Sequence, residues 1–376
     1  MDFSFTDEQV LLQESVARFI QNDYDFETRQ KNCSESAGFN AGNWNTFAEL
    51  GWLGVPFSEE DGGFGGSAVD TMILMEQFGR GLVVEPFLPS VILAGGALKV
   101  GGSAAQKEKL LAGIIDGSIQ GAFAYAEPQS RFNLADVATT AVADGSSFKL
   151  NGHKAVVLNA QNADVIVVTA RTSGEQRNES GISVFVLDAD TAGISRRDYP
   201  TVDALRASEL ILENVSVSKD NLLGTLGEGF ALVEQVIDEA ILAIGAEAVG
   251  AMEVLYKDTV EYCKTREQFG QPIGKFQVLQ HRMVDMFMEH EQSKSILFMA
   301  AIRLDEGYGP VAQKAVSALK VQLGKSARFV GQSAVQLHGG MGMTEELNIG
   351  HYFKRLTSIL TLFGNADFHL KRFGRL

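Results

Sequence analysis

Two acidic side chains on one predicted helix could act as general bases. Glu239 and Glu247 both fall in the stretch 228–264, which contains no proline and many small apolar residues. Burial among such residues would raise the pKa of a carboxyl towards the range of a useful general base. For Glu247 we favour the alternative of a structural carboxylate paired with a cation. The sequence therefore gives these two only as weak catalytic candidates.

A second set of residues is selected by the family resemblance described below, which implies a phosphate-bearing ligand site. A guanidinium such as that of Arg266 pairs with phosphate through two parallel donors, and glycine lets a ligand approach the backbone. Each residue alone also has a structural interpretation, since an arginine is ordinary on a solvated helix, a phenylalanine in a core and a glycine at a helix end. The set comprises Arg266, Phe269, Gln277, Gln336, Gly339 and Gly340.

Metal chemistry and secretion are not indicated. His338 and His351 have no Asp, Glu or Cys at metal spacing, so we expect no metal site. Cys33 and Cys263 are far apart, as expected of thiols in a reducing compartment. The opening stretch 1–5 has no basic or apolar signal region, and no apolar run approaches a bilayer span. We expect a cytoplasmic protein.

Composition bounds the architecture and the partners. The chain has 376 residues, of which 45% are hydrophobic, which suits two or three domains. Its formal net charge of −15 disfavours nucleic acid and anionic membranes as partners.

Periodicity divides the chain into three parts. Thr6 and Gln9 fit a capping box before a helical pattern, and further helices fit 43–53, 67–80 and 85–117. Strand patterns follow at 121–126, 135–143, 147–158, 164–169, 182–187 and 208–213. Long helices fit 228–264, 274–305, 310–338 and 344–373. We expect an α+β multidomain fold: a helical domain (1–120), a small antiparallel β-barrel or sandwich (121–226) and a four-helix bundle (227–376).

In this order of elements, the chain resembles the acyl-CoA dehydrogenase family along its whole length. Each matching segment is weak alone, and their order and spacing make the signal. The segments are Leu53-Gly54-Val55-Pro56, Asp61 to Gly66, Ala126-Glu127-Pro128, Arg206-Ala207-Ser208, Asn221 to Gly224 with Gly227 to Phe230, Arg266 to Gly270, Phe276 to Gln280 and Gln336 to Gly342.

The resemblance implies an FAD-dependent oxidoreductase acting on CH–CH groups. It would remove two hydrogens across the α,β bond of an acyl-CoA thioester, with a carboxylate taking the α proton and the flavin the β hydride. Family members are dimers or dimers of dimers with a shared flavin site. One chain walls the isoalloxazine, and its neighbour holds the ADP end. Arg266, Phe269, Gln277, Gln336, Gly339 and Gly340 match the ADP-holding set.

The catalytic base of the family is missing from both of its usual positions. The Tyr-Glu-Gly segment corresponds to Leu362-Phe363-Gly364, and the position on the long bundle helix is Ala240. Glu239 is one residue away, rotated by about 100°, whereas Glu247 lies about two turns along the same face.

The flavin wall also departs from the family pattern. The Thr-Glu-Pro-x-x-Gly-Ser-Asp loop corresponds to a segment that starts at Ala126 and carries Arg131 in place of the glycine. The Trp-Ile-Thr-Asn strand corresponds to 156–159, where Val156 replaces the tryptophan. A valine supplies neither an aromatic face nor a donor.

This asymmetry resembles the small, pimeloyl-CoA dehydrogenase-like subunits that join a complete acyl-CoA dehydrogenase chain in heterotetramers. Three hypotheses stay open: a dehydrogenase subunit completed in a homo- or hetero-oligomer, a structural subunit that supports a partner's FAD site, and a flavin oxidase or monooxygenase on this fold. A bulky acyl group, such as a sterol side chain or a dicarboxylate, is our expectation for the substrate, which points to fatty-acid or steroid side-chain degradation.

Overall fold

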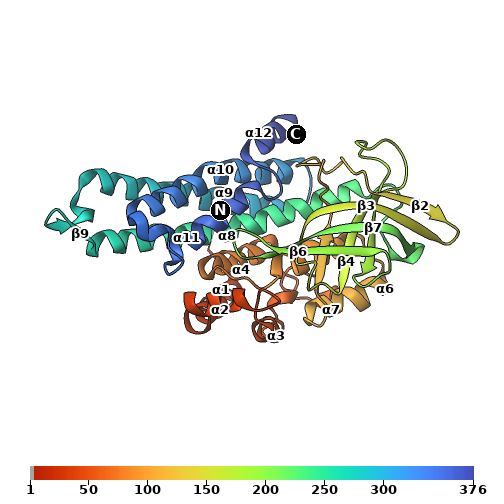
Figure 1. The fold of residues 1–376 in the computed structure, drawn as a ribbon, viewed down its shortest axis with the longest axis horizontal. Coiled ribbons are helices and arrows are strands. Elements are labelled where there is room, and N and C mark those ends of the chain that lie inside the picture. The colour runs from red at the N-terminus through yellow and green to blue at the C-terminus, as the bar shows by residue number, and fades with distance from the viewer. Residues whose placement is uncertain (1–3) are drawn as a thin grey trace. The chain divides into compact units, whose positions relative to one another are not determined.

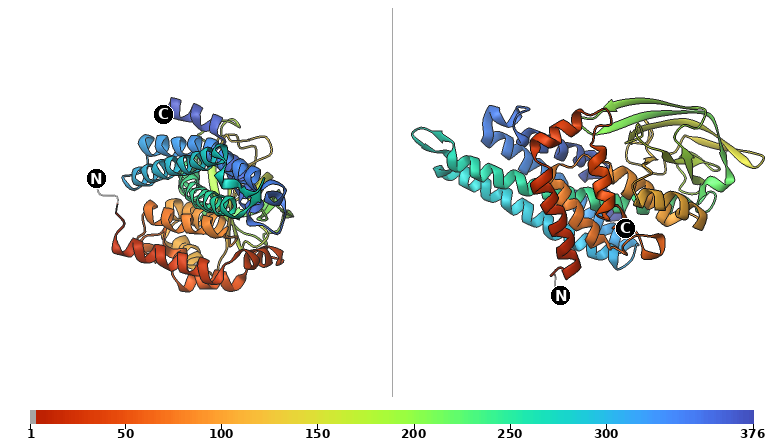
Figure 2. Two further views of the ribbon diagram at one scale, coloured as in Figure 1. Left: turned by 90° about the vertical axis from the view of Figure 1, so that its left-hand side faces the viewer. Right: turned by 90° about the horizontal axis from the view of Figure 1, so that it is seen from below.

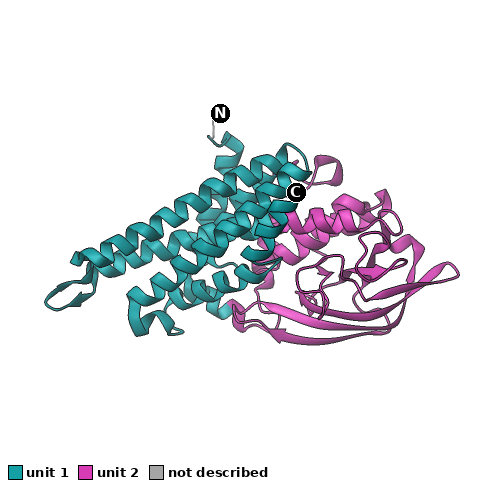
Figure 3. Ribbon diagram, turned by 90° about the horizontal axis from the view of Figure 1, so that it is seen from above, with its two compact units in different colours: residues 1–31, 68–83, 241–376 teal, residues 32–67, 84–240 magenta. Residues whose placement is uncertain are grey.

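The computed structural model describes residues 4–376 and divides them into two compact units. Residues 1–3, which belong to the opening stretch considered above, lie outside the described part. Unit 1 comprises residues 1–31, 68–83 and 241–376, and unit 2 comprises 32–67 and 84–240 (Figure 3). The order of elements along the chain is helical, then strands, then helical again (Figure 1), which confirms the predicted fold class.

Helices make up the first part of the chain. The capping box at Thr6 and Gln9 is present, with both reciprocal hydrogen bonds. The helix α2 was not predicted, and the predicted run 85–117 is a series of α- and π-helical turns. The elements are α1 (Asp7–Asp23), α2 (Phe26–Ser34), α3 (Ala41–Glu49), η1 (Trp52–Gly54), η2 (Glu59–Asp61), α4 (Ala68–Gly81), η3 (Leu88–Gly95), α5 (Gly96–Gly101), α6 (Ala104–Gln106), η4 (Lys107–Leu111) and α7 (Ala112–Ile115).

The strands form an 8-stranded sheet in unit 2, in the order β6-β7-β3-β2-β4-β5-β8, with β1 beside β4. Most pairings are antiparallel as predicted, but β1–β4 and β2–β4 are parallel, so the sheet is mixed. The strands are β1 (Gly121–Ala124), β2 (Thr140–Asp144), β3 (Ser147–Leu158), β4 (Val165–Arg171), β5 (Ile182–Asp188), β6 (Ile194–Pro200), β7 (Arg206–Ser218) and β8 (Leu222–Leu223). The predicted strand 135–143 starts only at Thr140, and β6 was missed.

Alternating apolar side chains of this sheet enclose a core. Phe148 and Phe185 meet there with ring centroids 5.3 Å apart, among the fully buried Leu150, Val168 and Leu210. The core fixes the register of β3, whose residues 154–158 belong to the candidate site in unit 2.

Long helices dominate unit 1 and run side by side in the views of Figure 2. They are α8 (Phe230–Thr265), which begins in unit 2, and α9 (Gln277–Asp305), α10 (Pro310–His338), α11 (Asn348–Thr361) and α12 (Ala366–Arg375). Short segments link them: β9 (Glu267–Gln268), β10 (Gln271–Pro272), η6 (Ile273–Lys275) and η7 (Gly339–Met343), whereas η5 (Lys219–Asn221) lies between β7 and β8 in unit 2.

The single predicted helix 344–373 is wrong, because the chain breaks between α11 and α12. Phe363 and Gly364 have φ angles of 58° and 109°, and an α-helix needs negative φ. A side chain at Gly364 would also lie 2.6 Å from the His369 ring. The turn is therefore fixed by a glycine at a position that helical periodicity alone does not reveal.

Small residues bring α4 and α8 into backbone contact within unit 1. A Cβ at Gly250 would lie 1.9 Å from the carbonyl oxygen of Glu76, and one at Gly79 would lie 2.0 Å from that of Glu247. The close helix approach expected from the small residues of 228–264 is thus present. It holds α8 against α4 around Gly250.

Candidate functional site

Arg266 stands where α8 ends and a two-residue hairpin begins. Its N–H donates to Tyr262 O at 2.8 Å, and its carbonyl accepts from Ile273 N at 2.8 Å. Phe269 and Gly270 make the hairpin turn with φ angles of 54° and 75°, the positive pair that a type I′ turn requires. The hairpin lies at one end of the unit 1 helices (Figures 1 and 3). Arg266 is therefore held by its backbone while its side chain is exposed.

Gly339 and Gly340 follow the last residue of α10. Gly339 has a φ angle of 61° and ends the helix by donating its N–H to Gln336 O. A Cβ at either glycine would meet nothing within 4 Å. No described atom crowds either position, but the positive φ of Gly339 by itself favours glycine at the end of α10.

All six residues of the predicted phosphate-site set are exposed on unit 1, and we call them the Arg266 surface. Phe269 is 92% exposed, so the alternative that it belongs to the core is excluded. Within residues 4–376, the side chains of Arg266, Gln277 and Gln336 have no hydrogen-bond or ion-pair partner. Their donors remain available to a ligand or to another polypeptide.

The wall segments, 126–136 and 156–159, belong to unit 2 and have a different character. Val156 is 47% exposed and has a φ angle of 52°, a genuine outlier for a β-branched residue. It lies at a register shift between β3 and β7. Arg131, which replaces a family glycine, keeps a positive φ of 49°. Strained backbone of this kind concentrates at functional sites and costs about 1–3 kcal/mol per residue.

Polar groups near Val156 are used within unit 2. Asn159 is buried, donates to Gln120 Oε1 at 3.1 Å and accepts from Asn162 at 2.8 Å. Leu158 stands where the family pattern has threonine, so this strand offers no free hydroxyl. The wall therefore lacks the aromatic face and the donor that a flavin ring would need from it.

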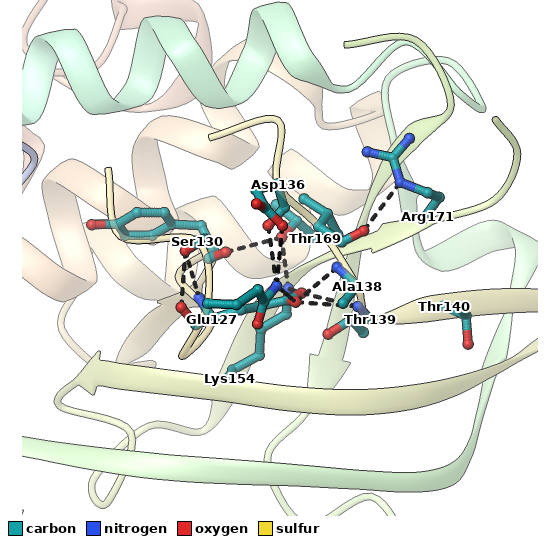
Figure 4. Close-up of polar contacts among 12 residues, drawn as sticks. Glu127, Ser130, Asp136, Ala138, Thr139, Thr140, Lys154, Thr169 and Arg171 are labelled. Atoms are coloured by element: carbon teal, nitrogen blue, oxygen red, sulfur yellow. Dashed lines mark hydrogen bonds and ion pairs between the residues drawn. The ribbon is translucent and has the colours of Figure 1, made fainter. Parts of the chain in front are cut away.

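A buried ion pair joins the segment 126–136 to β3 (Figure 4). Lys154 Nζ lies 2.6 Å from Glu127 Oε1 and donates to Thr169 Oγ1 at 2.9 Å. Glu127 also accepts the backbone N–H groups of Ala138 and Thr139 at 2.8 and 3.1 Å. Burial lowers the pKa of Lys154 to about 8 despite the attraction of Glu127. Burial opposes ionisation of Glu127, but Lys154 and the hydrogen bonds outweigh it and lower the pKa of this carboxyl.

Arg171 fastens the loop after Glu127 to the loop that follows β4. Its guanidinium donates to the carbonyls of Ala135 and Gln176, both at 2.9 Å, and to that of Val137 at 3.1 Å. Asp136 accepts from Gln176 Nε2 at 2.6 Å. Glu127, Lys154 and Arg171 thus act on the shape of the segment rather than on its exposed surface.

The two acidic candidates are both ion-paired. Glu247 is 4% exposed, and Arg355 donates to its two carboxylate oxygens at 2.5 and 2.7 Å. Glu239 lies 2.6 Å from Lys99 Nζ. Ala240, at the family's base position, is fully buried. Glu247 therefore has the arrangement that the structural interpretation expects.

The second base position is occupied by an apolar turn. Phe363 is 8% exposed, and its carbonyl lies 2.9 Å from His369 Nε2. Lys320, only 2% exposed, donates to Ile359 O at the end of α11. Burial lowers the pKa of Lys320 to about 7 and that of His369 to about 4. No carboxylate stands at this turn among the contacts that the described residues make.

Comparison with known proteins places the chain in a family. Its residues 6–118, 122–215 and 227–375 match the N-terminal, middle and C-terminal domains of acyl-CoA dehydrogenase. The probable acyl-CoA dehydrogenase YngJ of Bacillus subtilis is 30% identical over 354 residues, which cover 93% of this chain and 92% of that protein. The chain belongs to the acyl-CoA dehydrogenase family.

Solved structures support the same assignment. A structure described as the FAD complex of PigA has a TM-score of 0.92 and 26% identity, covering 100% of this chain and 98% of that one. A Tcur3481-Tcur3483 steroid acyl-CoA dehydrogenase has a TM-score of 0.87 and 28% identity, covering 98% and 97%. The protein is thus of a class of flavoprotein oxidoreductases that act on CH–CH groups, and FAD is the cofactor of that class.

The residues fit FAD in one part and not in the other. The free guanidinium and amides of the Arg266 surface suit a diphosphate and an adenine. The wall segments do not suit an isoalloxazine ring, since Val156 and Leu158 replace the aromatic and hydroxyl groups of the family pattern. FAD therefore matches the ADP-holding half of the family site and not the flavin-walling half in this chain.

Sequence reasoning missed the ionic supports of the site. Lys154 lies inside the predicted strand 147–158, and its pairing with Glu127 spans 27 residues. No spacing pattern in the sequence pointed to Arg355 or Lys320. Among residues 4–376, no cluster of His, Cys, Asp and Glu could hold a metal ion, and no helix is long and apolar enough to cross a membrane.

Proposed function

We propose that this chain is a subunit of an FAD-dependent acyl-CoA dehydrogenase whose flavin site is completed in an oligomer. The reaction is the α,β-dehydrogenation of an acyl-CoA thioester. In this assembly the Arg266 surface holds the ADP portion of FAD for a neighbouring chain. That neighbour is either a second copy or a different acyl-CoA dehydrogenase chain in a heterotetramer.

One contrast supports the proposal. Arg266, Gln277 and Gln336 are exposed, and their donors have no partner within residues 4–376. Exposed polar side chains of this kind contribute little to the stability of a single chain. Their donors gain partners when a phosphate-bearing ligand is bound between two chains. By comparison, Asn159 and Glu247 already have partners inside their own units.

The chain's own residues would act by binding and positioning. Arg266 would neutralise the diphosphate, and the open backbone at Gly339 and Gly340 would let the dinucleotide lie against the end of α10. Bound FAD supplies the hydride acceptor for the β carbon. We assign no base in this chain, because Glu247 and Glu239 are both ion-paired.

A second candidate is a catalytically incomplete subunit that only supports the FAD site of its partner. Phe363 and Ala240 at the two base positions favour it, because neither can accept a proton. The Tcur3481-Tcur3483 steroid enzyme carries two chain names, which adds weight to a hetero-oligomer and to a bulky acyl substrate. In both candidates the Arg266 surface has the same task.

The experiment is to purify the full-length chain alone and together with a partner chain that carries an intact base, then measure bound FAD and acyl-CoA turnover with a ferrocenium acceptor. We expect little FAD and no turnover in the chain alone, and both in the complex. Arg266→Gln in this chain should lower the FAD content of the complex, whereas Arg18→Gln, exposed on α1 in unit 1, should not. Full FAD and turnover in the isolated chain at homo-oligomeric stoichiometry would exclude the structural subunit. An equal FAD content in the wild-type and Arg266→Gln complexes would refute the proposed role of the surface.

A further inference from the structure

Two rings join the ends of the helices that carry the Arg266 surface. Tyr262 lies in the last turn of α8 and His338 is the last residue of α10. Their ring centroids are 4.3 Å apart with an interplanar angle of 29°. Arg266 follows Tyr262 by four residues, about 6 Å along a helix, and Gly339 follows His338 directly. The stack therefore lies between the two halves of the surface.

The His338 ring is held in one orientation. It is 5% exposed, and its Nδ1 lies 2.8 Å from Ala334 O. A carbonyl only accepts, so Nδ1 carries the proton. Burial lowers the pKa of His338, so the ring stays neutral near pH 7. A fixed, neutral ring is a suitable stacking partner for Tyr262.

Arg266 is tied to the same stack through its backbone. Tyr262 O accepts the Arg266 N–H at 2.8 Å, so a movement of the Tyr262 backbone moves Arg266. Nearer the start of α8, Gly245 packs against Leu319 of α10. That contact is 17 residues, or about 25 Å, from Tyr262. A small change in helix angle there becomes a displacement of ångströms at Arg266 unless the ends are also joined.

We propose that the Tyr262–His338 stack is a positioning element of the cofactor surface, which holds Arg266 in register with Gly339 and Gly340. The inference rests on the proposed function, because it assigns both segments to the ADP portion of one dinucleotide. Bidentate recognition of a diphosphate requires the guanidinium at a fixed distance from the neighbouring backbone. Tyr262 and His338 need not touch the ligand for this role.

The test uses ADP as the probe and the full-length chain assembled, without FAD, in its oligomer, with affinity measured by calorimetry. His338→Ala and Tyr262→Ala should each weaken ADP binding about five- to tenfold, the range of a lost ring pair. His338→Phe and Tyr262→Phe keep the stacking and should stay within about twofold of wild type. Val316→Ala, a cavity variant in the buried part of α10, should lower the melting temperature and leave ADP affinity unchanged.

The outcomes separate the two claims. If wild type does not bind ADP, or Arg266→Gln does not weaken binding, the proposed function fails and the inference fails with it. If Arg266 matters but the His338→Ala chain binds like wild type, only the positioning role is overturned. Equal losses in His338→Ala, His338→Phe and Val316→Ala would reduce the stack to a general contribution to stability and would also overturn it.

Discussion

The Arg266 surface and the wall segments use polar residues in opposite ways. On the surface in unit 1, Arg266, Gln277 and Gln336 are exposed and have no side-chain partner within residues 4–376. In the wall segments of unit 2, Glu127 and Asn159 are buried and bonded within the unit. Donors that are already bonded shape a loop, and unused donors can bind a ligand. The proposed function therefore assigns the cofactor contact to the Arg266 surface and not to the wall segments.

The largest effect on the free energy of unfolding should come from the Lys154–Glu127 ion pair. Lys154→Met leaves Glu127 buried without its cation and should cost about 3–5 kcal/mol in free energy of unfolding, measured by urea denaturation. Lys149→Met, at an exposed pair with Asp144, is the matched control and should change stability by less than about 0.5 kcal/mol. A small loss at Lys154 would mean that Glu127 is not dependent on it.

A buried pair in unit 1 tests whether Glu247 is structural. Glu247→Gln leaves the Arg355 cation without its counter-charge and should destabilise the chain by about 3 kcal/mol. Glu239→Gln, at a half-exposed pair, should cost about 0.5 kcal/mol. If turnover of the assembled enzyme disappeared in Glu247→Gln while stability stayed unchanged, Glu247 would be a base after all.

Substitution of Arg266 should lower ligand affinity and leave stability unchanged, the reverse of the two ion-pair variants. Arg266→Met removes charge-assisted hydrogen bonds worth about 2 kcal/mol, so we expect about 30-fold weaker ADP binding. Its free energy of unfolding should change by less than about 0.5 kcal/mol, because the side chain has no partner within residues 4–376. A destabilised variant with normal ADP affinity would contradict the comparison between the two regions.

The turn at Phe363 should make stability depend on pH. Lys320 has a pKa of about 7 in the folded chain and 10.5 ordinarily, so the unfolded chain binds more protons between these values. Stability should therefore rise with pH from about 7 to 10, by up to about 1.4 kcal/mol per pH unit. Lys320→Met should remove the rise between about pH 7 and 8 and leave above it only the share of Lys154, whose pKa is about 8, whereas Lys325→Met, exposed on the same helix, should keep the full slope. An unchanged slope in Lys320→Met would show that the amine is charged in its buried position.

The smallest effect concerns the strained wall. Val156→Gly should stabilise the chain by about 1 kcal/mol, because glycine adopts a φ angle of 52° without strain. Val142→Gly, at an exposed strand position with ordinary φ, should instead cost about 0.5–1 kcal/mol. Loss of stability in Val156→Gly would mean that the side chain contributes more than the backbone strain costs.

Local signals in the sequence predicted local structure well. The capping box of Thr6 and Gln9 is present, and the small residues around Gly250 do bring helices together. Strand β6 was missed because its exposed residues 194–200 alternate weakly. The break at Gly364 was missed because the apolar periodicity of α11 and α12 continues through it. Hydrophobic periodicity reports burial, and it does not report the φ angle of one residue.

The six residues of the Arg266 surface were found through family motifs, and the partners of the ion pairs were not. Glu127 and Lys154 lie 27 positions apart, and Glu247 and Arg355 lie 108 apart. No local pattern links such positions, so only the folded chain identifies the pairs. The exposure of Phe269 likewise follows from the hairpin, since its sequence context suits a core equally well.

The most direct measurement is the reactivity of Arg266 towards an arginine-specific dicarbonyl reagent, mapped by mass spectrometry. The account predicts that Arg266 is modified rapidly in the isolated chain and is protected in the FAD-bound oligomer, while Arg328, on α10, keeps its reactivity in both states. If Arg266 reacts equally fast in the assembled, FAD-loaded enzyme, this surface does not hold the cofactor and the central claim is contradicted.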